Sequence, residues 1–233
     1  MILTVTIVSL FSLTSHEWGA CSRDSRPAMP TAGTACSFSG KIELTREGKK
    51  VEAAGRVVIY VQRLPAIELH RSARTHSIRQ VDEQFQPNLL VMQVGDSVEF
   101  YNEDNIEHSV FSNALANAFE FPRSLRGVTG RRTFMFAGPM RIGCDIHGSM
   151  RADVLVLQNP FWTSVQADGS WTLSGVPRGA HTLVAWEPNG GVTKIRLKQC
   201  SGSMLTVVMP ALEEAPEPKP KRKNGGNYVE YSQ

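Results

Sequence analysis

The sequence has no long apolar run, no closely spaced pair of cysteines and no large excess of charge of one sign. Its apolar N-terminal segment is shorter than the roughly 20 residues that a helix needs to cross a bilayer. The four cysteines form no CxxC redox or zinc motif. The net charge is +3 over 233 residues, with basic and acidic side chains interleaved. These absences argue against a membrane span, a zinc module and a nucleic-acid partner.

Helical periodicity is also scarce. Short runs of Val, Ile, Leu and Phe instead recur between Gly, Pro, Asn and Asp, which is typical of β-strands joined by turns. The hydrophobic content of 41% is enough for a sizeable core in one large domain or two small ones. The sequence therefore predicts an all-β protein.

The first residues, MILTVTIVSLFSL, indicate a signal peptide over residues 1–20. No basic residue stands in this segment and no clear cleavage site follows it, so a buried N-terminal strand is the alternative. Cys21 follows Gly19 and Ala20 as a lipoprotein acceptor would, although Trp18 stands where such motifs usually have Leu. A lipid on Cys21 would be the protein's link to a membrane. Export would place the protein in the periplasm or the cell envelope.

At the other end the composition changes to ALEEAPEPKPKRKNGGNYVEYSQ, which alternates Pro with charge and has few aliphatic side chains. Such a segment buries too little apolar surface to fold, so we expect residues 211–233 to be a disordered tail. Its KPKRK cluster could touch an acidic surface, but a solvated tail is the commoner situation.

The most informative stretch is a C-x2-H-x2-M pattern formed by Cys144, His147 and Met150. It follows the apolar-rich run Thr133–Ile142 and so belongs on a loop after a strand. Thiolate and thioether are soft ligands and imidazole is borderline, a set that suits copper and excludes Mg²⁺ or Ca²⁺ as the natural ion. Because the loop supplies three ligands, this interpretation requires a further histidine from a distant segment.

His108 meets that requirement. It begins the alternating strand His108–Phe111 after the polar turn Asn102–Asn105, and Val94–Phe100 upstream predicts a turn that leads into a strand. Taken singly, each candidate ligand has a metal-free explanation as an inert buried thiol, a core methionine or an ordinary loop or strand histidine. The combination favours a metal site.

These residues together resemble the cupredoxin family of plastocyanin, amicyanin and pseudoazurin, whose pattern runs Gly-Asp-x-Val-x-Phe-x-Asn, then His, then a C-x2-H-x2–4-M loop. The loop is similar to that of bacterial methylamine-utilisation-like proteins. The resemblance implies a Greek-key β-sandwich over residues 70–158 with one type 1 copper site. In that family's arrangement His108, Cys144 and His147 would bind copper in a plane and Met150 would be the weak axial ligand.

Three positions depart from the family's pattern. Asp145 and Ile146 stand where many relatives have Ser or Thr and then Pro, and a carboxylate so near the thiolate is expected to lower the reduction potential or contact a partner. Ser109 stands where many relatives have an Asn that ties the two ligand loops by hydrogen bonds. Because serine has a shorter reach, the hydrogen bonds around the ligands are not predicted.

A second module is predicted on both sides of that domain. Ser170–Glu187 contains a strand, a Pro-Gly turn and a second strand, interpreted as a hairpin, and resembles the second half of a transthyretin-like or carboxypeptidase-regulatory-like β-sandwich. Ser39–Leu64 resembles the first half. We expect one sandwich split into residues 36–66 and 160–210 by the cupredoxin insertion. The alternative is two consecutive domains, with the N-terminal hairpin belonging to the cupredoxin.

Export would favour a disulfide bond. If Cys144 is reserved for the metal, the natural pair is Cys36 with Cys200, and Cys21 is left over. Such a bond would join the start of the split module to a loop near its end.

The resemblance implies a carrier of single electrons and not an enzyme, with copper alternating between Cu(I) and Cu(II). Its partner would be a redox protein. Between residues 111 and 151, six arginines outnumber two acidic residues, an excess that would steer an acidic partner, although scattered solvated arginines explain it equally well. Two other functions stay open, an envelope protein that sequesters or transfers Cu(I), and a metal-free interaction module. The histidine clusters of a multicopper oxidase are missing.

Overall fold

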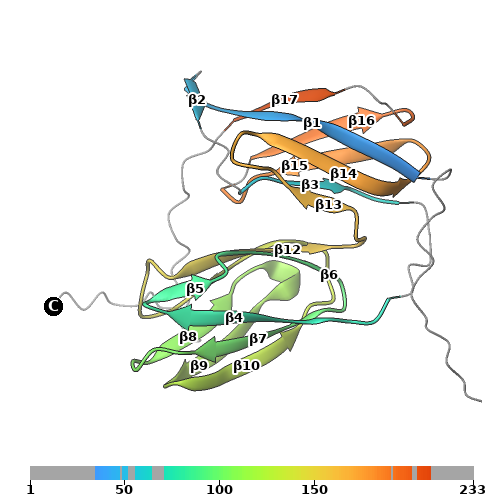
Figure 1. The fold of residues 1–233 in the computed structure, drawn as a ribbon. Helices are drawn as coiled ribbons and strands as arrows, with labels where there is room; N and C mark the ends of the chain where they lie inside the picture. Colours follow the sequence, from blue (N-terminus) through green and yellow to red (C-terminus); the bar gives the residue numbers. More distant parts are fainter. Residues whose placement is uncertain are drawn as a thin grey trace, which may run out of the picture.

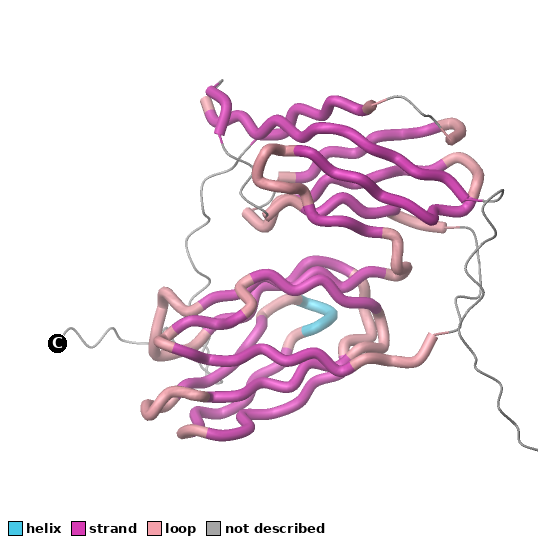
Figure 2. The backbone as a smooth tube through the Cα atoms, viewed as in Figure 1, coloured by secondary structure: helices cyan, strands magenta, loops and turns pink. Residues whose placement is uncertain are grey.

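The chain folds into two β-sandwiches that lie one above the other in the computed structural model (Figure 1). The structure describes residues 35–47, 49–51, 56–64, 71–189, 191–200 and 204–210. The all-β prediction is confirmed, because strands and loops dominate these residues and their one helical element is the 3-10 turn η1 (Leu115–Asn117) (Figure 2). None of them forms a helix long and apolar enough to span a membrane. The predicted signal peptide, Cys21 and the predicted tail lie outside the described residues.

We call residues 71–159 the site domain. One of its sheets has the strand order β10-β7-β4-β5 and the other the order β6-β12-β11-β8-β9. The strands are β4 (Thr75–Val81), β5 (Gln84–Gln86), β6 (Leu89–Gln93), β7 (Ser97–Asn102), β8 (His108–Ser112), β9 (Phe119–Ser124), β10 (Gly127–Thr133), β11 (Gly138–Gly143) and β12 (Arg151–Leu157). Large side chains from both sheets, among them Phe100, Phe134 and Ile142, fill the space between them.

We call residues 35–64 and 160–210 the outer domain. Its sheets have the orders β14-β1-β17, with β2 beside β1, and β13-β3-β15-β16. The strands are β1 (Ala35–Arg46), β2 (Lys49–Val51), β3 (Val58–Val61), β13 (Trp162–Ser164), β14 (Ser170–Pro177), β15 (His181–Trp186), β16 (Val192–Leu197) and β17 (Leu205–Pro210). Strands that precede the site domain in the chain thus pair with strands that follow it, in both sheets.

The predicted hairpin within Ser170–Glu187 is wrong. β14 pairs with β1, whereas β15 pairs with β3 and β16 in the other sheet. The turn between β14 and β15, with Gly179 at φ 144°, therefore carries the chain from one sheet to the other. Turn residues indicate that the chain reverses, but not whether the flanking strands pair or face each other across a core.

The disulfide bond Cys36–Cys200 joins the two segments of the outer domain, with the two Cα atoms 5.6 Å apart. Cys36 lies on β1 and is 3% exposed, and Cys200 follows β16. Cys144 is a free, buried thiol. The structure therefore leaves Cys144 available for chemistry in the site domain.

β12 is buried on both faces because it lies between the two domains. Val154 and Val156 face the core of the site domain, whereas Leu155 and Leu157 pack against Trp186 and other side chains of the outer domain. This position explains why the second half of β12, residues 154–157, is a continuous apolar run instead of an alternating one.

An aspartate between two arginines lies at the same junction. Asp153 is 4% exposed and accepts hydrogen bonds from Arg141 Nε at 2.9 Å and Arg56 NH2 at 3.2 Å. Arg141 also reaches the carbonyl oxygen of Pro188 at 3.4 Å and Asn189 Oδ1 at 3.3 Å. Because buried charges are tolerated when they are paired and hydrogen-bonded, this network fixes one relative placement of the two domains.

Candidate metal centre

The strand order brings the predicted ligands to one end of the site domain. β8 begins at His108, and its neighbour β11 ends at Gly143, directly before Cys144. The two strands are antiparallel, and Gly143 pairs with Phe111. The start of β8 and the loop after β11 therefore meet at the same edge.

Three of the four predicted ligands converge there. The ligand atoms of His108, Cys144 and His147 all lie within 4.8 Å of one another. His108 Nδ1 lies 3.0 Å from His147 Nδ1, which in turn lies 3.7 Å from Cys144 Sγ. His108 is fully buried and Cys144 is 5% exposed, whereas His147 is partly exposed. Two imidazoles and one thiol with donor atoms this close form a ready-made site for a soft or borderline metal ion.

Met150, the fourth predicted ligand, closes the loop. Its main-chain oxygen accepts a hydrogen bond from Cys144 N at 3.3 Å, and its main-chain nitrogen donates to His147 O at 3.0 Å. Its side chain is 1% exposed and lies in the core of the site domain. The two hydrogen bonds make the six-residue spacing a compact turn, so Cys144, His147 and Met150 all belong to one closed loop.

Ser109 ties the two ligand segments together despite its short side chain. Its Oγ accepts a hydrogen bond from Asp145 N at 2.9 Å and donates to Asp145 Oδ1 at 2.5 Å. The same oxygen lies 3.8 Å from Cys144 Sγ. The two ligand segments lie close enough here for a serine to join them by hydrogen bonds. The sequence alone did not predict this link.

The carboxylate next to the thiol is neutralised by an arginine. Arg123 NH2 and Nε lie 2.9 and 3.1 Å from Asp145 Oδ2. The sequence suggested that Asp145 would lower the reduction potential or contact a partner, and this ion pair offsets the field that such a carboxylate would exert on a metal. Arg141, one of the six arginines between residues 111 and 151, is 18% exposed and bound to Asp153.

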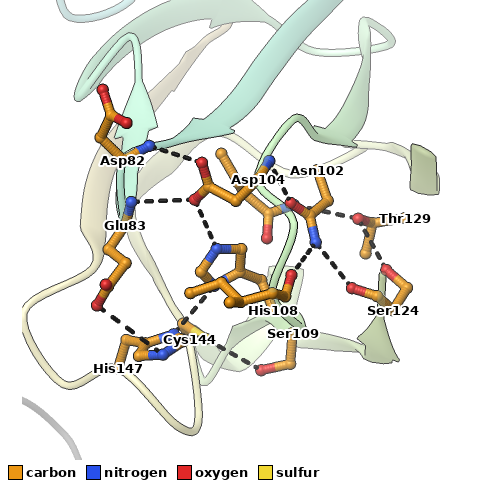
Figure 3. A network of polar contacts seen from close by, with 12 residues as sticks. Asp82, Glu83, Asn102, Asp104, His108, Ser109, Ser124, Thr129, Cys144 and His147 are labelled. Atoms are coloured by element: carbon orange, nitrogen blue, oxygen red, sulfur yellow. Dashed lines mark hydrogen bonds and ion pairs between the residues drawn. The ribbon is translucent and has the colours of Figure 1, made fainter. Parts of the chain in front are cut away.

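Asp104 is a functional candidate that the sequence did not reveal. Its Oδ2 lies 2.8 Å from His108 Nε2, and its two oxygens accept hydrogen bonds from the main-chain nitrogens of Asp82 at 2.8 Å and Glu83 at 3.0 Å (Figure 3). Burial alone would raise the pKa of Asp104, but the hydrogen bonds from Glu83, His108 and Asp82 outweigh it and the net direction is down. An ionised carboxylate can only accept a hydrogen bond, so this contact favours a proton on His108 Nε2 and leaves Nδ1 directed at His147.

Glu83 is the second residue that the sequence did not reveal. Its Oε2 lies 3.9 Å from His147 Nε2, and its side chain is 57% exposed. It belongs to the two-residue turn between β4 and β5 (Figure 3). No spacing in the sequence relates this turn to the ligand loop, because the contact exists only once the two sheets have packed.

Comparison with known proteins finds solved structures of copper proteins at low similarity. No family model and no curated protein matches the chain. Among solved structures, a Cu(I) form of an amicyanin mutant is 24% identical with a TM-score of 0.33 and covers 35% of this chain and 81% of its own. A second amicyanin mutant with Cu(I) is 23% identical with a TM-score of 0.33 and covers 43% of this chain and 98% of its own.

A copper-containing nitrite reductase from Thermus scotoductus is 24% identical with a TM-score of 0.35. The match covers 42% of this chain and 25% of the nitrite reductase chain. Similarities of this size carry no argument about function, so the inference below rests on the donor atoms themselves.

Proposed function

We propose that this protein binds one copper ion through His108, Cys144 and His147, with Met150 as a weak axial ligand, and carries single electrons between partner proteins. The observation that carries the proposal is the convergence of two imidazole nitrogens and one thiol within 4.8 Å at one end of a β-sandwich. Thiolate and thioether select copper over hard cations, and a thioether as the fourth donor is unusual for zinc.

The chain's own residues keep the donor atoms in place. Ser109 holds the cysteine end of the loop through Asp145, and the Met150 hydrogen bonds close its other end. Copper, when bound, would supply a reversible one-electron change. A site whose ligands are already in position needs little rearrangement between oxidation states, which favours electron transfer over substrate chemistry.

His147 is the proposed edge through which electrons leave. It is the more exposed of the two histidines, and its neighbour in sequence Ile146 is 37% exposed. Ile106, in the loop that leads to His108, is 43% exposed. We propose that a redox protein docks here. Arg123, Arg131 and Arg141 are paired with carboxylates, which weakens the steering of an acidic partner.

The proposed location is outside the cytoplasm, in the periplasm or cell envelope. The Cys36–Cys200 disulfide supports it, because disulfides persist in oxidising compartments. The proposed signal peptide over residues 1–20 points the same way, and Cys21 would be the point of attachment of a lipid.

Loading the purified protein with Cu(II) tests the metal site. We expect an intense absorption band near about 600 nm, together with the EPR signal of a thiolate-bound copper. Electron self-exchange, measured by NMR line broadening in mixtures of the two oxidation states, then tests the function. Fast exchange supports a carrier, whereas slow exchange with very tight Cu(I) binding favours copper sequestration or transfer. A protein that retains no copper would favour a metal-free interaction module.

Substituting Met150, the proposed fourth ligand, should change the reduction potential and keep the visible colour. We expect Met150→Gln to retain the visible band while its reduction potential falls by at least about 59 mV, equivalent to a tenfold change in the preference for Cu(II) over Cu(I). The harder amide oxygen stabilises Cu(II), and protein-film voltammetry measures the shift. Met140→Leu, in the same buried core, is the matched control and should leave the potential unchanged. An unchanged potential in Met150→Gln would remove Met150 from the ligand set.

A further inference from the structure

The two-residue turn between β4 and β5 has an unusual conformation. Val81 pairs with Gln84, so Asp82 and Glu83 form the turn, and their φ angles of 51° and 55° are both in the left-handed region. Two-residue turns of this type favour Asn, Asp or Gly at the first position and Gly at the second, so Asp82 suits its place, whereas Glu83 is strained. The turn is held by two main-chain hydrogen bonds to the Asp104 carboxylate.

Asp104 is itself fixed from its other side. Its main-chain nitrogen donates to Asn102 Oδ1 at 2.9 Å. Asn102 is 1% exposed and its amide donates to Ile106 O and Ser124 O, both at 2.8 Å. The loop from Asn102 to His108 is thus cross-braced, and the Asp104 carboxylate has no freedom to turn away from the imidazole that it faces.

The same turn reaches both histidines of the site. Its main-chain nitrogens orient Asp104, which contacts the outer nitrogen of His108 at 2.8 Å. The Glu83 side chain contacts the outer nitrogen of His147 at 3.9 Å. Each imidazole therefore faces the site with Nδ1 and a carboxylate with Nε2 (Figure 3).

We propose that Asp104 is a positioning residue of the metal centre, which fixes the Nδ1-ligating tautomer of His108, and that the Glu83 carboxylate beside His147 adds to the bias of the site toward Cu(II). A carboxylate behind a ligating imidazole raises the basicity of the ligand, and the doubly charged ion gains more from that than the singly charged one. Asp104 should have the larger effect, because its contact with His108 is short and partly buried. The contact of Glu83 with His147 is longer, and the Glu83 side chain is exposed. This proposal rests on the proposed copper site.

The variants Asp104→Asn and Glu83→Gln test it, with Asp82→Asn as the matched control. Asp104→Asn keeps the size of the side chain but replaces one carboxylate oxygen with an NH2 group. That group is a hydrogen-bond donor, and it would face the N–H donors that now bind the carboxylate. Glu83→Gln keeps the main-chain donor and removes the charge beside His147. Asp82→Asn removes a neighbouring charge that touches neither histidine, and asparagine suits its left-handed backbone.

Two readouts separate the proposal from the copper site on which it rests. The first is ¹⁵N NMR of the histidine rings in the metal-free protein, recorded at a pH where imidazoles are neutral. We expect His108 of the unchanged protein to carry its proton on Nε2, and Asp104→Asn to lose that preference. If the unchanged protein carries the proton on Nδ1, the proposal is overturned, whether or not any variant folds.

The second readout is copper affinity and potential. We expect Asp104→Asn to bind Cu(II) about 10–100-fold more weakly with a smaller change for Cu(I), so that the potential rises by about 59 mV for each tenfold of difference. Glu83→Gln should give a smaller rise with the His108 tautomer unchanged, and Asp82→Asn should give none. Equal effects in Asp82→Asn and Asp104→Asn would mean general electrostatics and overturn the positioning role. If the protein without substitutions shows no thiolate-copper band, that result contradicts the proposed function. The NMR result still decides the role of Asp104 in that case.

Discussion

Replacing Cys144 with serine should abolish the visible absorption band of the Cu(II)-loaded protein and weaken Cu(I) binding by roughly two orders of magnitude or more. The band arises from charge transfer between a thiolate and Cu(II), which a hydroxyl cannot provide. The hydroxyl is also a hard, protonated donor that Cu(I) binds poorly. Absorption and EPR spectra measure the first loss, and competition with a Cu(I) chelator measures the second.

Ser109→Ala is the comparison variant for Cys144→Ser, because it loosens the ligand loop without removing a ligand. The Ser109 hydroxyl lies 3.8 Å from the sulfur but is no ligand, so its loss should shift the band and leave most of its intensity. The serine in place of Cys144 is nearly the same size, and the site is at the end of a strand, so the thermal unfolding curve should change little. A band that survives in Cys144→Ser would show that the thiol does not bind copper.

The position of the candidate site could be predicted because its chemistry is concentrated in a short stretch. Cys144, His147 and Met150 follow one another at fixed spacing after an apolar run, so local sequence alone places them on a loop after a strand. The need for another histidine pointed to His108, which also starts a strand. The structure brings these segments to one end of one sandwich.

The residues behind the ligands could not be predicted, because their contacts are made by the main chain and by distant segments. Asp104 is held by the nitrogens of a turn, and backbone hydrogen bonds leave no trace in residue type. Glu83 meets His147 only because the sheet that contains β4 and β5 packs against the sheet that contains β11. The wrong hairpin between β14 and β15 has the same origin, since local turn signals do not specify which strands pair.

Removing the Cys36–Cys200 disulfide should cost the protein about 5 kcal/mol in the free energy of unfolding. The two residues are 164 positions apart, so the reduced unfolded chain gains the conformational freedom of a very long loop. If the site domain stays folded while the outer domain opens, the flexible part of that loop is roughly halved. The cost in free energy then falls by only about 0.6 kcal/mol, because loop entropy depends on the logarithm of loop length. Urea denaturation of Cys36→Ala/Cys200→Ala, followed by circular dichroism, measures the change.

The location of the bond in the outer domain provides the control for this prediction. Both cysteines belong to the outer domain, and the ligand segments belong to the site domain, so the double variant should retain the copper spectrum under conditions where it is folded. A chemically reduced sample of the unchanged protein should match the double variant, apart from the small loss of packing when the buried Cys36 sulfur is removed. A difference of less than about 1 kcal/mol between oxidised and reduced protein would contradict the prediction, since it would mean that the unfolded chain already keeps its two outer segments together.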